Sequence, residues 1–215
     1  MSGKDLTGTI LTEADLSDAT LTDVDLSGKD LIGTILIGAD LTGANLTGFD
    51  FSSRDLTGTI LTGYDLSGRD LTGTILTGAN LSDATLTDVD LSGKDLTGTI
   101  LTRVDLSDKD LTDTNFTNAN LKNTHLRNAV LIGAILTGAD LENAMLLSVN
   151  LDSANLTNAV LRSTLLVDAN LSNTILTGAD FSQATLTGAI LTGANLEDAI
   201  LINTILNCVG HPICV

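Results

Sequence analysis

Regularly spaced carboxylates are the first residues of this chain that could do chemistry. In its first half, aspartate recurs every twenty residues, at Asp30, Asp50, Asp70, Asp90 and Asp110. Carboxylates that a fold brings together can bind hard cations such as Ca²⁺. They can also form a solvated acidic surface, and the net charge of −17 favours this alternative. We therefore expect an acidic interaction face without a bound metal.

Basic residues stand directly before several of these aspartates. The tripeptide Lys/Arg-Asp-Leu occurs six times, beginning at Lys4, Lys29, Arg54, Arg69, Lys94 and Lys109. Beside a row of like charges, a basic side chain would relieve the repulsion between neighbouring carboxylates. Duplication of a segment is the alternative explanation, because residues 11–36 and 76–101 are identical at 23 of 26 positions.

The last nine residues, NCVGHPICV, hold both cysteines and one of the two histidines. Cys208, His211 and Cys214 are three residues apart, which leaves three alternatives open. One is a zinc site, although a fourth ligand is missing. Another is a disulfide, which would require an oxidising compartment. The third is an apolar flap over the end of the fold, formed by Val209, Ile213 and Val215.

No grouping of residues indicates an enzyme. The two histidines, His125 and His211, are not part of a Ser/His/Asp pattern, and the chain contains no phosphate-binding glycine loop. A net charge of −17 would repel a phosphate backbone, which disfavours direct binding of nucleic acid. We expect no catalytic residue, no cofactor and no nucleic acid, and we expect another protein as the partner.

The elements that position these residues follow from a period of five. Every fifth residue from Leu6 to Leu206 is leucine, except for Phe51, Phe116 and Phe181. In an α-helix five residues rotate through about 500°, and in a strand an odd step alternates between the two faces. Neither element can bury such a set. A chain that turns a corner in every pentad can, because each leucine then points into one shared interior.

The residues that follow each leucine have the chemistry of corners. The first is mostly Thr or Ser, as at Thr42 and Ser82, and the second is mostly Gly, Asp, Asn or Ser, as at Gly43 and Asn118. Such residues favour turns, and their side chains can bond nearby main-chain groups. The residue two before each leucine is often alanine, as at Ala39, and is small enough for a place where backbones crowd together.

These pentads resemble those of the pentapeptide-repeat family, whose motif is A-(D/N)-L-x-x. Residues 38–48 (GADLTGANLTG) and 193–201 (GANLEDAIL) are close to the motif, and the resemblance covers residues 4–206. It implies an all-β fold, a right-handed quadrilateral parallel β-helix with four pentads per coil. About ten coils, spaced by about 4.8 Å, would follow, with Leu and Phe inside. The core would then include Leu46, Phe51, Leu96, Phe116, Leu156 and Phe181.

Composition divides this single repeat domain, residues 1–206, into two halves. Residues 1–112 are rich in glycine and contain the Lys/Arg-Asp-Leu units, whereas residues 113–206 use asparagine at the corners. Residues 207–215 form a short tail outside the repeat. The first 110 residues hold 19 acids and 7 bases, and the rest hold 8 acids and 3 bases. Most of the negative charge therefore lies in the first half.

The basic residues of the first half occupy a position that the family gives to a small, inward residue. Phe49 and Tyr64 occupy the same position. Burying an unpaired charge costs on the order of several kcal/mol. We expect the basic side chains to extend outward past the corner, with the following aspartate as charge partner; a local change of the backbone is the alternative. Coils of twenty residues place them on two neighbouring faces: Lys29, Arg69 and Lys109 on one, Arg54 and Lys94 on the next.

The position before each leucine faces outward in this fold, and in the second half it is often apolar. Counting in twenties stacks Ile135 with Ile175, and Val160 with Ile200, two coils apart. Such rows indicate a contact surface, and we expect self-association through them. The apolar residues at this position are Val130, Ile135, Met145, Val160, Leu165, Ile175, Ile190, Ile200 and Ile205.

The sequence favours a non-catalytic scaffold, an acidic rod that binds or assembles with an unidentified protein partner. A homo-oligomer is expected, either a dimer or an end-to-end or lateral assembly. The family resemblance implies a further alternative, because some members mimic DNA and inhibit or protect DNA gyrase, as in quinolone resistance.

We expect a cytoplasmic protein that does not enter a membrane. The first residues contain no apolar signal segment. No run of the chain approaches the roughly 18 apolar residues that a membrane helix needs. An extracytoplasmic location is the alternative if a leader has been removed.

Overall fold

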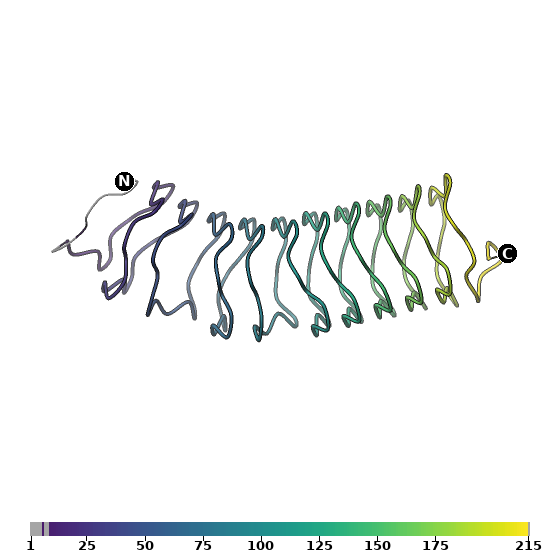
Figure 1. The fold of residues 1–215 in the computed structure, drawn as a ribbon, viewed down its shortest axis with the longest axis horizontal. Coiled ribbons are helices and arrows are strands. Elements are labelled where there is room, and N and C mark those ends of the chain that lie inside the picture. Colours follow the sequence, from purple (N-terminus) through teal and green to yellow (C-terminus); the bar gives the residue numbers. More distant parts are fainter. Residues whose placement is uncertain (1–5, 7–8, 215) are drawn as a thin grey trace. The chain divides into compact units, whose positions relative to one another are not determined.

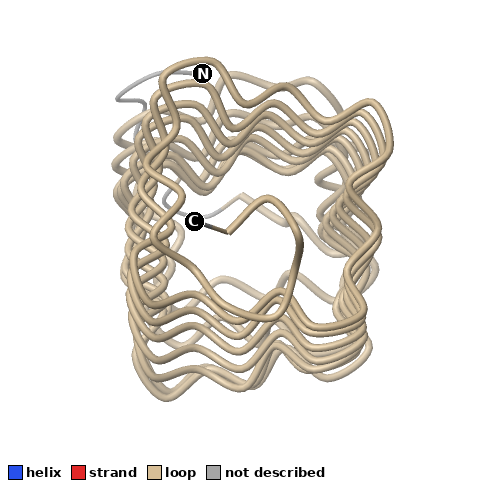
Figure 2. Cartoon of the chain, turned by 90° about the vertical axis from the view of Figure 1, so that its right-hand side faces the viewer, coloured by secondary structure: helices blue, strands red, loops and turns tan. Residues whose placement is uncertain are grey.

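The computed structural model describes residue 6 and residues 9–214, and these residues form coils joined by isolated β-bridges. The bridges are parallel and connect residues on consecutive coils, such as Asp40 with Ile60. The described residues contain no helix and no extended strand. They therefore include no helix long and apolar enough to span a bilayer. Four pentads complete each coil, and Figure 2 shows its four-sided outline. The fold is the predicted right-handed quadrilateral parallel β-helix.

The chain forms two compact units, Met1–Asp90 and Leu91–Val215, which we call unit 1 and unit 2. Each unit is a stack of such coils (Figure 1). We number the four sides of the coils in each unit separately. In unit 1, sides 1, 2, 3 and 4 begin with the pentads around positions 15, 20, 25 and 30. In unit 2 they begin with the pentads around positions 95, 100, 105 and 110. Each side then continues at every twentieth position along its unit. The change of composition at residue 112 lies within unit 2.

The second residue after each leucine builds the corner between two sides. Its φ is positive at every such position from Glu13 to Asn203, with values such as 68° at Gly43 and 55° at Asn118. Glycine adopts this left-handed conformation freely, and Asn and Asp adopt it more readily than other residues. The corner residues predicted from the sequence are therefore confirmed.

In a closed coil, main-chain donors are satisfied through a fixed set of hydrogen bonds. The N–H of Phe116 donates to the carbonyl of Ile135 on the next coil at 2.7 Å, and the N–H of Ile135 donates back to the carbonyl of Thr114 at 3.0 Å. Where Asp or Asn precedes the core residue, its side chain can accept from the N–H two residues on, as Asn115 does from Thr117 at 3.0 Å. These Asp and Asn residues therefore build the corners as well as the polar surface.

One leucine or phenylalanine from each pentad fills the interior. Every such residue from Leu6 to Leu191 is buried, whereas Leu196, Leu201 and Leu206 near the end of unit 2 are partly exposed. Each buried side chain contributes about 1.5–3 kcal/mol before chain entropy is subtracted. The six core residues named from the sequence are all buried: Leu46, Phe51, Leu96, Phe116, Leu156 and Phe181.

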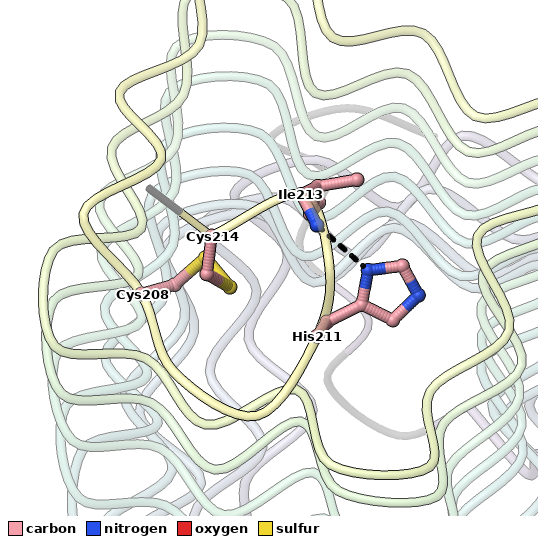
Figure 3. Close-up of a disulfide and its surroundings, with 4 residues drawn as sticks. All are labelled: Cys208, His211, Ile213 and Cys214. Atoms are coloured by element: carbon pink, nitrogen blue, oxygen red, sulfur yellow. Dashed lines mark hydrogen bonds between the residues drawn. A yellow bond between two sulfur atoms is a disulfide. The ribbon is translucent and has the colours of Figure 1, made fainter.

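The tail closes on itself at the end of unit 2. Val209 forms a bridge with Ile190, and the chain then turns inward across the last coil (Figure 2). Cys208 and Cys214 form a disulfide, and His211 Nδ1 accepts a hydrogen bond from the main chain two residues on (Figure 3). Among the three alternatives for the tail, the structure therefore has the disulfide, which takes up both thiols that a zinc site would use. Two residues named above, Lys4 and Val215, lie outside the described part of the chain.

Candidate interaction surfaces

Side 4 of unit 1 carries the predicted acidic row. Asp50 Oδ1 accepts hydrogen bonds from the hydroxyl of Ser52 at 2.7 Å and from its N–H at 3.0 Å. These two bonds, and more weakly the charge of Arg54, lower the pKa of Asp50, whereas the neighbouring carboxylate of Asp70 raises it. The row in unit 1 consists of four exposed aspartates, one on each coil: Asp30, Asp50, Asp70 and Asp90.

The fifth predicted member, Asp110, lies on side 4 of unit 2. It is exposed and accepts a hydrogen bond from the N–H of Thr112 at 3.0 Å. In the part of the chain that the structure describes, no group of three or more His, Cys, Asp or Glu residues has a geometry that could hold a metal ion. The structure therefore presents these carboxylates as turn-building surface groups.

The four aspartates of unit 1 form no β-bridge. We call the position two before each core leucine the inner position, and the residue that occupies it explains most of the missing bridges. We call two outward residues on consecutive coils a rung, which is closed when a bridge joins them and open when none does. In unit 1 every closed rung ends at a residue preceded by Ala or Thr. Valine permits both states, since Asp90 after Val89 is unbridged and Asn150 after Val149 is bridged. The other open rungs within the described residues of unit 1 end directly after Lys29, Phe49, Arg54, Tyr64 and Arg69.

Arg54 shows what replaces a closed rung. Its Nη1 donates to the carbonyl of Leu31 at 2.9 Å, and its Nε donates to the carbonyl of Asp50 at 3.1 Å. The guanidinium carbon lies 5.2 Å from the centre of the Phe49 ring, within the range of a cation–π contact. The side chain is therefore held between consecutive coils by main-chain and aromatic partners.

The coils before and after Arg54 carry threonine at the same position. Thr34 and Thr74 each donate from the hydroxyl to the carbonyl of the core residue 23 positions earlier, at 2.8 Å. Arg54 makes the same bond to a carbonyl 23 positions earlier. The rungs that end after the two threonines are closed, and the rung that ends after Arg54 is open. The arginine thus keeps the bond to the carbonyl, and the rung that ends after it is open.

Lys29 follows the same rule, which corrects an expectation from the sequence. Its Nζ donates to the carbonyl of Leu6 at 2.7 Å, and the side chain is half-buried. We expected Lys29 and Arg54 to extend past the corner and pair with the next aspartate. Instead, both bond main-chain carbonyls, and among the described residues neither forms an ion pair with the aspartate after it. For Arg69, Lys94 and Lys109 the pairing stays a prediction.

An aromatic cluster fills the space beside the open rungs of unit 1. The rings of Phe49 and Phe51 meet edge to face at 4.7 Å between centroids, and Phe51 lies 6.0 Å from Tyr64. Burial raises the pKa of Tyr64. The sequence marked Phe49 and Tyr64 as too large for their position, but it did not show that both pack on Phe51.

The apolar rows predicted for self-association lie on two sides of unit 2. Ile135, Ile175 and Ile200 are 40%, 43% and 41% exposed, and Val160 is half-buried. On side 1 the bridges place an asparagine between Ile135 and Ile175, and on side 2 they place Asp180 between Val160 and Ile200. The structure therefore aligns both rows, with a polar residue interrupting each.

Ion pairs along side 2 of unit 2 did not emerge from the sequence. Lys122 Nζ lies 3.0 Å from Asp140 Oδ2 and 2.8 Å from Glu142 Oε2, and Arg162 pairs with Asp180 on the next coil. Burial raises the pKa of Asp180, but bonds from Ser182 and from Arg162 outweigh it and leave the pKa below its ordinary value. Spacings of 18 and 20 residues between opposite charges were the signal that could have revealed these pairs.

The repeats match the family model described as "Pentapeptide repeats", in eight copies. The matched residues are 1–28, 30–63, 65–103, 95–131, 110–146, 124–162 and 164–201. No curated protein sequence matches the chain.

Several solved structures are similar to this chain. The pentapeptide repeat protein HetL of the cyanobacterium Nostoc, involved in regulating heterocyst differentiation, is 30% identical over 92% of this chain and 90% of its own length, with a TM-score of 0.46. A pentapeptide repeat protein of the Arabidopsis thaliana thylakoid lumen is 31% identical over 51% of this chain and 63% of its own, with a TM-score of 0.33. The plasmid-mediated fluoroquinolone resistance protein QnrB1 is 20% identical over 74% of this chain and 75% of its own, with a TM-score of 0.30.

The family model matches residues 1–201 apart from residues 29, 64 and 163, which is well over half of the chain. The four-sided coils, with one buried leucine in each pentad, are the fold of the same family. The chain therefore belongs to the pentapeptide repeat family.

Proposed function

We propose that this chain is a non-catalytic scaffold that binds other proteins through the outer surfaces of its coils. The exposed apolar residues of unit 2 carry the proposal. Where Asn155 accepts a hydrogen bond from the N–H of Thr157 at 3.0 Å, Ile135 and Ile175 on the neighbouring coils have no side-chain acceptor to offer. These residues forgo a corner bond and expose apolar surface, and burial against a partner would offset both costs.

The state of the polar side chains also supports a scaffold rather than an enzyme. Hydroxyls and carboxylates that could act as nucleophiles or bases are engaged with each other at the corners, as Thr57 is with Asp55 at 2.6 Å and Ser52 is with Asp50 at 2.7 Å. The same local bond repeats from coil to coil. Such a pattern stabilises turns and does not assemble different functional groups around one point.

Solution mass, measured by light scattering over a wide concentration range, tests whether a second copy is among the partners. Mass that rises with concentration supports a self-associating scaffold, and lysine at Ile135 and Ile175 together would reduce the rise if the side 1 row contributes. A constant monomeric mass at the highest concentration would remove self-association from the proposal and leave binding of a different protein.

Inhibition or protection of DNA gyrase is the second candidate. The observation that favours it is the exposed carboxylate row on side 4 of unit 1, with the pKa of Asp50 held low. Gyrase supercoiling, assayed with micromolar protein, is the test, and a lack of effect would reject this function. In a matched variant, Asp30, Asp50 and Asp70 become asparagine, which removes the charge and keeps the oxygen that accepts the corner bond. An effect that survives in this variant does not come from the carboxylate row.

The disulfide bears on the compartment. The cytoplasm keeps most thiols reduced, so the Cys208–Cys214 bond supports the extracytoplasmic alternative over the expected cytoplasmic location. Alkylation of free thiols in intact cells, followed by mass measurement, separates the two. Labelled cysteines would indicate a reducing compartment, and unlabelled, bridged cysteines an oxidising one.

A further inference from the structure

Side 3 of unit 2 carries an apolar strip that differs from the two predicted rows. Consecutive coils place Met145, Leu165, Thr185 and Ile205 in the outward position, and β-bridges join each to the next. Two residues further along the first two coils, Leu147 and Val167 lie at the neighbouring corner. We call these six residues the side-3 strip: Met145, Leu147, Leu165, Val167, Thr185 and Ile205.

Within the described residues of unit 2, side 3 is the one side on which more than two consecutive outward positions lack Asp and Asn: His125 comes first, and the four outward residues of the strip follow it. On sides 1 and 2, Asp or Asn separates the apolar residues, as Asp180 separates Val160 from Ile200. On side 4, Asn150 and Asn170 lie between Val130 and Ile190. The side-3 strip is therefore the longest uninterrupted run of apolar and threonine side chains on the outside of this unit.

The repeat itself does not require apolar residues at these positions. In unit 1 the same side carries Asp25 and Asp65, which accept hydrogen bonds from the N–H groups of Ser27 and Ser67 at 2.9 Å. Met145 and Leu165 cannot accept such a bond, and the described residues offer no acceptor to the N–H groups two positions on. The strip thus gives up corner bonds that unit 1 retains, without burying its side chains within the coil.

Two basic residues near the strip are held in ion pairs on the neighbouring side. Lys122 and Arg162 lie at the corner between side 2 and side 3, and their charged groups pair with Asp140 and Asp180 on side 2. Glu142 shares the ion pair of Lys122. The six residues of the strip are themselves uncharged in a chain with a net charge of −17, although Arg127 lies in line with Leu147 on the coil before and Asp168 directly follows Val167.

We propose that the side-3 strip is the contact between two copies of this chain. The proposal rests on the scaffold function above and names one partner and its surface. Charge supports it, because two acidic chains repel each other wherever charged sides meet, and the strip is free of charge. Spacing supports it as well: a second copy presents the same side chains with the same repeat of about 4.8 Å, so the two rows interdigitate along their whole length. A surface with another repeat would lose register within a few coils.

The size of the strip sets the expected affinity. Four coils give a length of roughly 15–20 Å. A stable interface buries about 800 Å² on each partner, and this strip is too short to supply that area. We therefore expect a two-fold symmetric, reversible dimer with a dissociation constant of about 1 μM or weaker.

Sedimentation equilibrium of the full chain at rising concentration tests the proposal. The strip variant is Met145→Asn with Leu165→Asn, which restores the corner acceptors that the repeat uses elsewhere. The matched control is Ile135→Asn with Ile175→Asn on side 1. These isoleucines are 40% and 43% exposed, which is close to the 40% of Leu165. We expect the strip variant to weaken dimerisation at least tenfold and the control to leave it unchanged.

Each other outcome overturns the proposal in a recognisable way. If the side 1 control dissociates the dimer and the strip variant does not, the strip is not the contact, and the scaffold function stands with a different surface. If neither variant has an effect on a dimer, the contact lies elsewhere. A wild-type chain that stays monomeric rejects self-association altogether. Should the asparagine variant lose its fold, Met145→Thr with Leu165→Thr, which copies Thr185, replaces it in the same experiment.

Discussion

Unit 1 and unit 2 are built from the same pentad and yet join their coils differently. In unit 2 every outward residue from Asn115 to Ile205 is bridged to the coil before it. In unit 1, rungs are open directly after Lys29, Phe49, Arg54, Tyr64 and Arg69. The leucine period is the same in both units, so it determines the coil. The residue at the inner position accounts for most of the difference in how one coil is bonded to the next, although valine occurs in both states.

An open rung lacks two main-chain hydrogen bonds, each of which contributes about 0.5–1.5 kcal/mol net. Side chains fill the space instead, as Arg54 does with its bonds to main-chain carbonyls and Phe49 with its contact to Phe51. Unit 1 is therefore joined more by side chains and less by its main chain, and it has more freedom to rearrange around a defect. Four predictions test this difference.

Truncation of core phenylalanines should have the largest effect and should differ between the units. Phe116→Ala leaves a cavity among closed coils that cannot collapse, and we expect a loss near the upper end of about 3–5 kcal/mol. Phe51 lies beside Phe49 and Tyr64, which can move into the space that Phe51→Ala leaves. The loss of stability in this variant should therefore be near the lower end of the same range. Urea unfolding with unit-specific NMR signals measures both. Equal losses would show that open rungs give no freedom to repack.

Transplanting an arginine into unit 2 should reproduce the open state there. Thr114 donates to the carbonyl of Leu91 at 2.9 Å, and the rung that ends at Asn115 is closed by two main-chain bonds of 2.8 and 2.9 Å. Thr114→Arg should open this rung and cost about 1–3 kcal/mol, the net value of two hydrogen bonds.

Amide hydrogen exchange provides the measurement for this variant. The N–H groups of Leu96 and Asn115 should exchange faster, while those of Leu136 and Asn155, two coils further on, serve as an internal control. Unchanged protection at Leu96 would mean that arginine at the inner position does not open the rung by itself.

The sequence was sufficient for the fold, because the period of five indicates a coil that turns in every pentad and the family resemblance implies its right-handed, four-sided form. Forty-one leucines or phenylalanines in phase, with Gly, Asn or Asp at the corner, exclude helix and strand and require a turn in each pentad. The interior followed directly, since each residue in that phase faces the same space. Because the core residue and the corner residues recur in every pentad, any one pentad is enough to predict their positions.

The surfaces were harder to predict, because they depend on contacts between coils. The sequence identified Lys29 and Arg54 as misfits, but their partners are main-chain carbonyls 23 residues earlier, which no side-chain pattern reveals. The rows Ile135–Ile175 and Val160–Ile200 were found by counting in twenties, whereas the strip from Met145 to Ile205 requires two neighbouring positions to be compared on each coil. Spacing alone also did not decide among the three alternatives for Cys208 and Cys214.

The reverse substitution should close an open rung in unit 1. Arg54→Thr places threonine where Thr34 and Thr74 already occupy closed rungs, and the hydroxyl can keep the bond to the carbonyl of Leu31. Two main-chain hydrogen bonds would form between the pentads around Ile35 and Asp55. Loss of the contact with Phe49 would offset part of the gain in stability. We expect a net stabilisation of about 0.5–1.5 kcal/mol.

Hydrogen exchange again reports the result, with slower exchange expected at Leu36 and Asp55. Arg54→Lys is the matched control, because it retains length and charge at the inner position and should leave the rung open. Protection of Leu36 in the lysine variant would show that the guanidinium, and not the length of the side chain, separates the coils.

Carboxyl titration should produce the smallest difference between the units. In unit 2 the pKa is lowered at Asp105 and Asp180, and in unit 1 hydrogen bonds from Ser or Thr two residues on are the main cause of a lowered pKa at Asp15, Asp25, Asp40, Asp50 and Asp65. A carboxyl with a lower pKa in the folded state stabilises the fold above its unfolded pKa, near 3.8, and this contribution is lost as the pH falls through the folded value. Acidification below about pH 4 should therefore destabilise unit 1 more than unit 2.

The urea midpoint of each unit, followed by NMR at pH 6 and at pH 3, measures this difference. Asp50→Asn with Asp65→Asn keeps the oxygens that accept the corner bonds and removes two titrating groups, so unit 1 should become less sensitive to acid. Protonation also relieves repulsion between Asp50 and Asp70, which acts in the opposite direction. A midpoint for unit 1 that rises at pH 3 would show that this repulsion, and not the corner bonds, dominates the pH dependence of the acidic row.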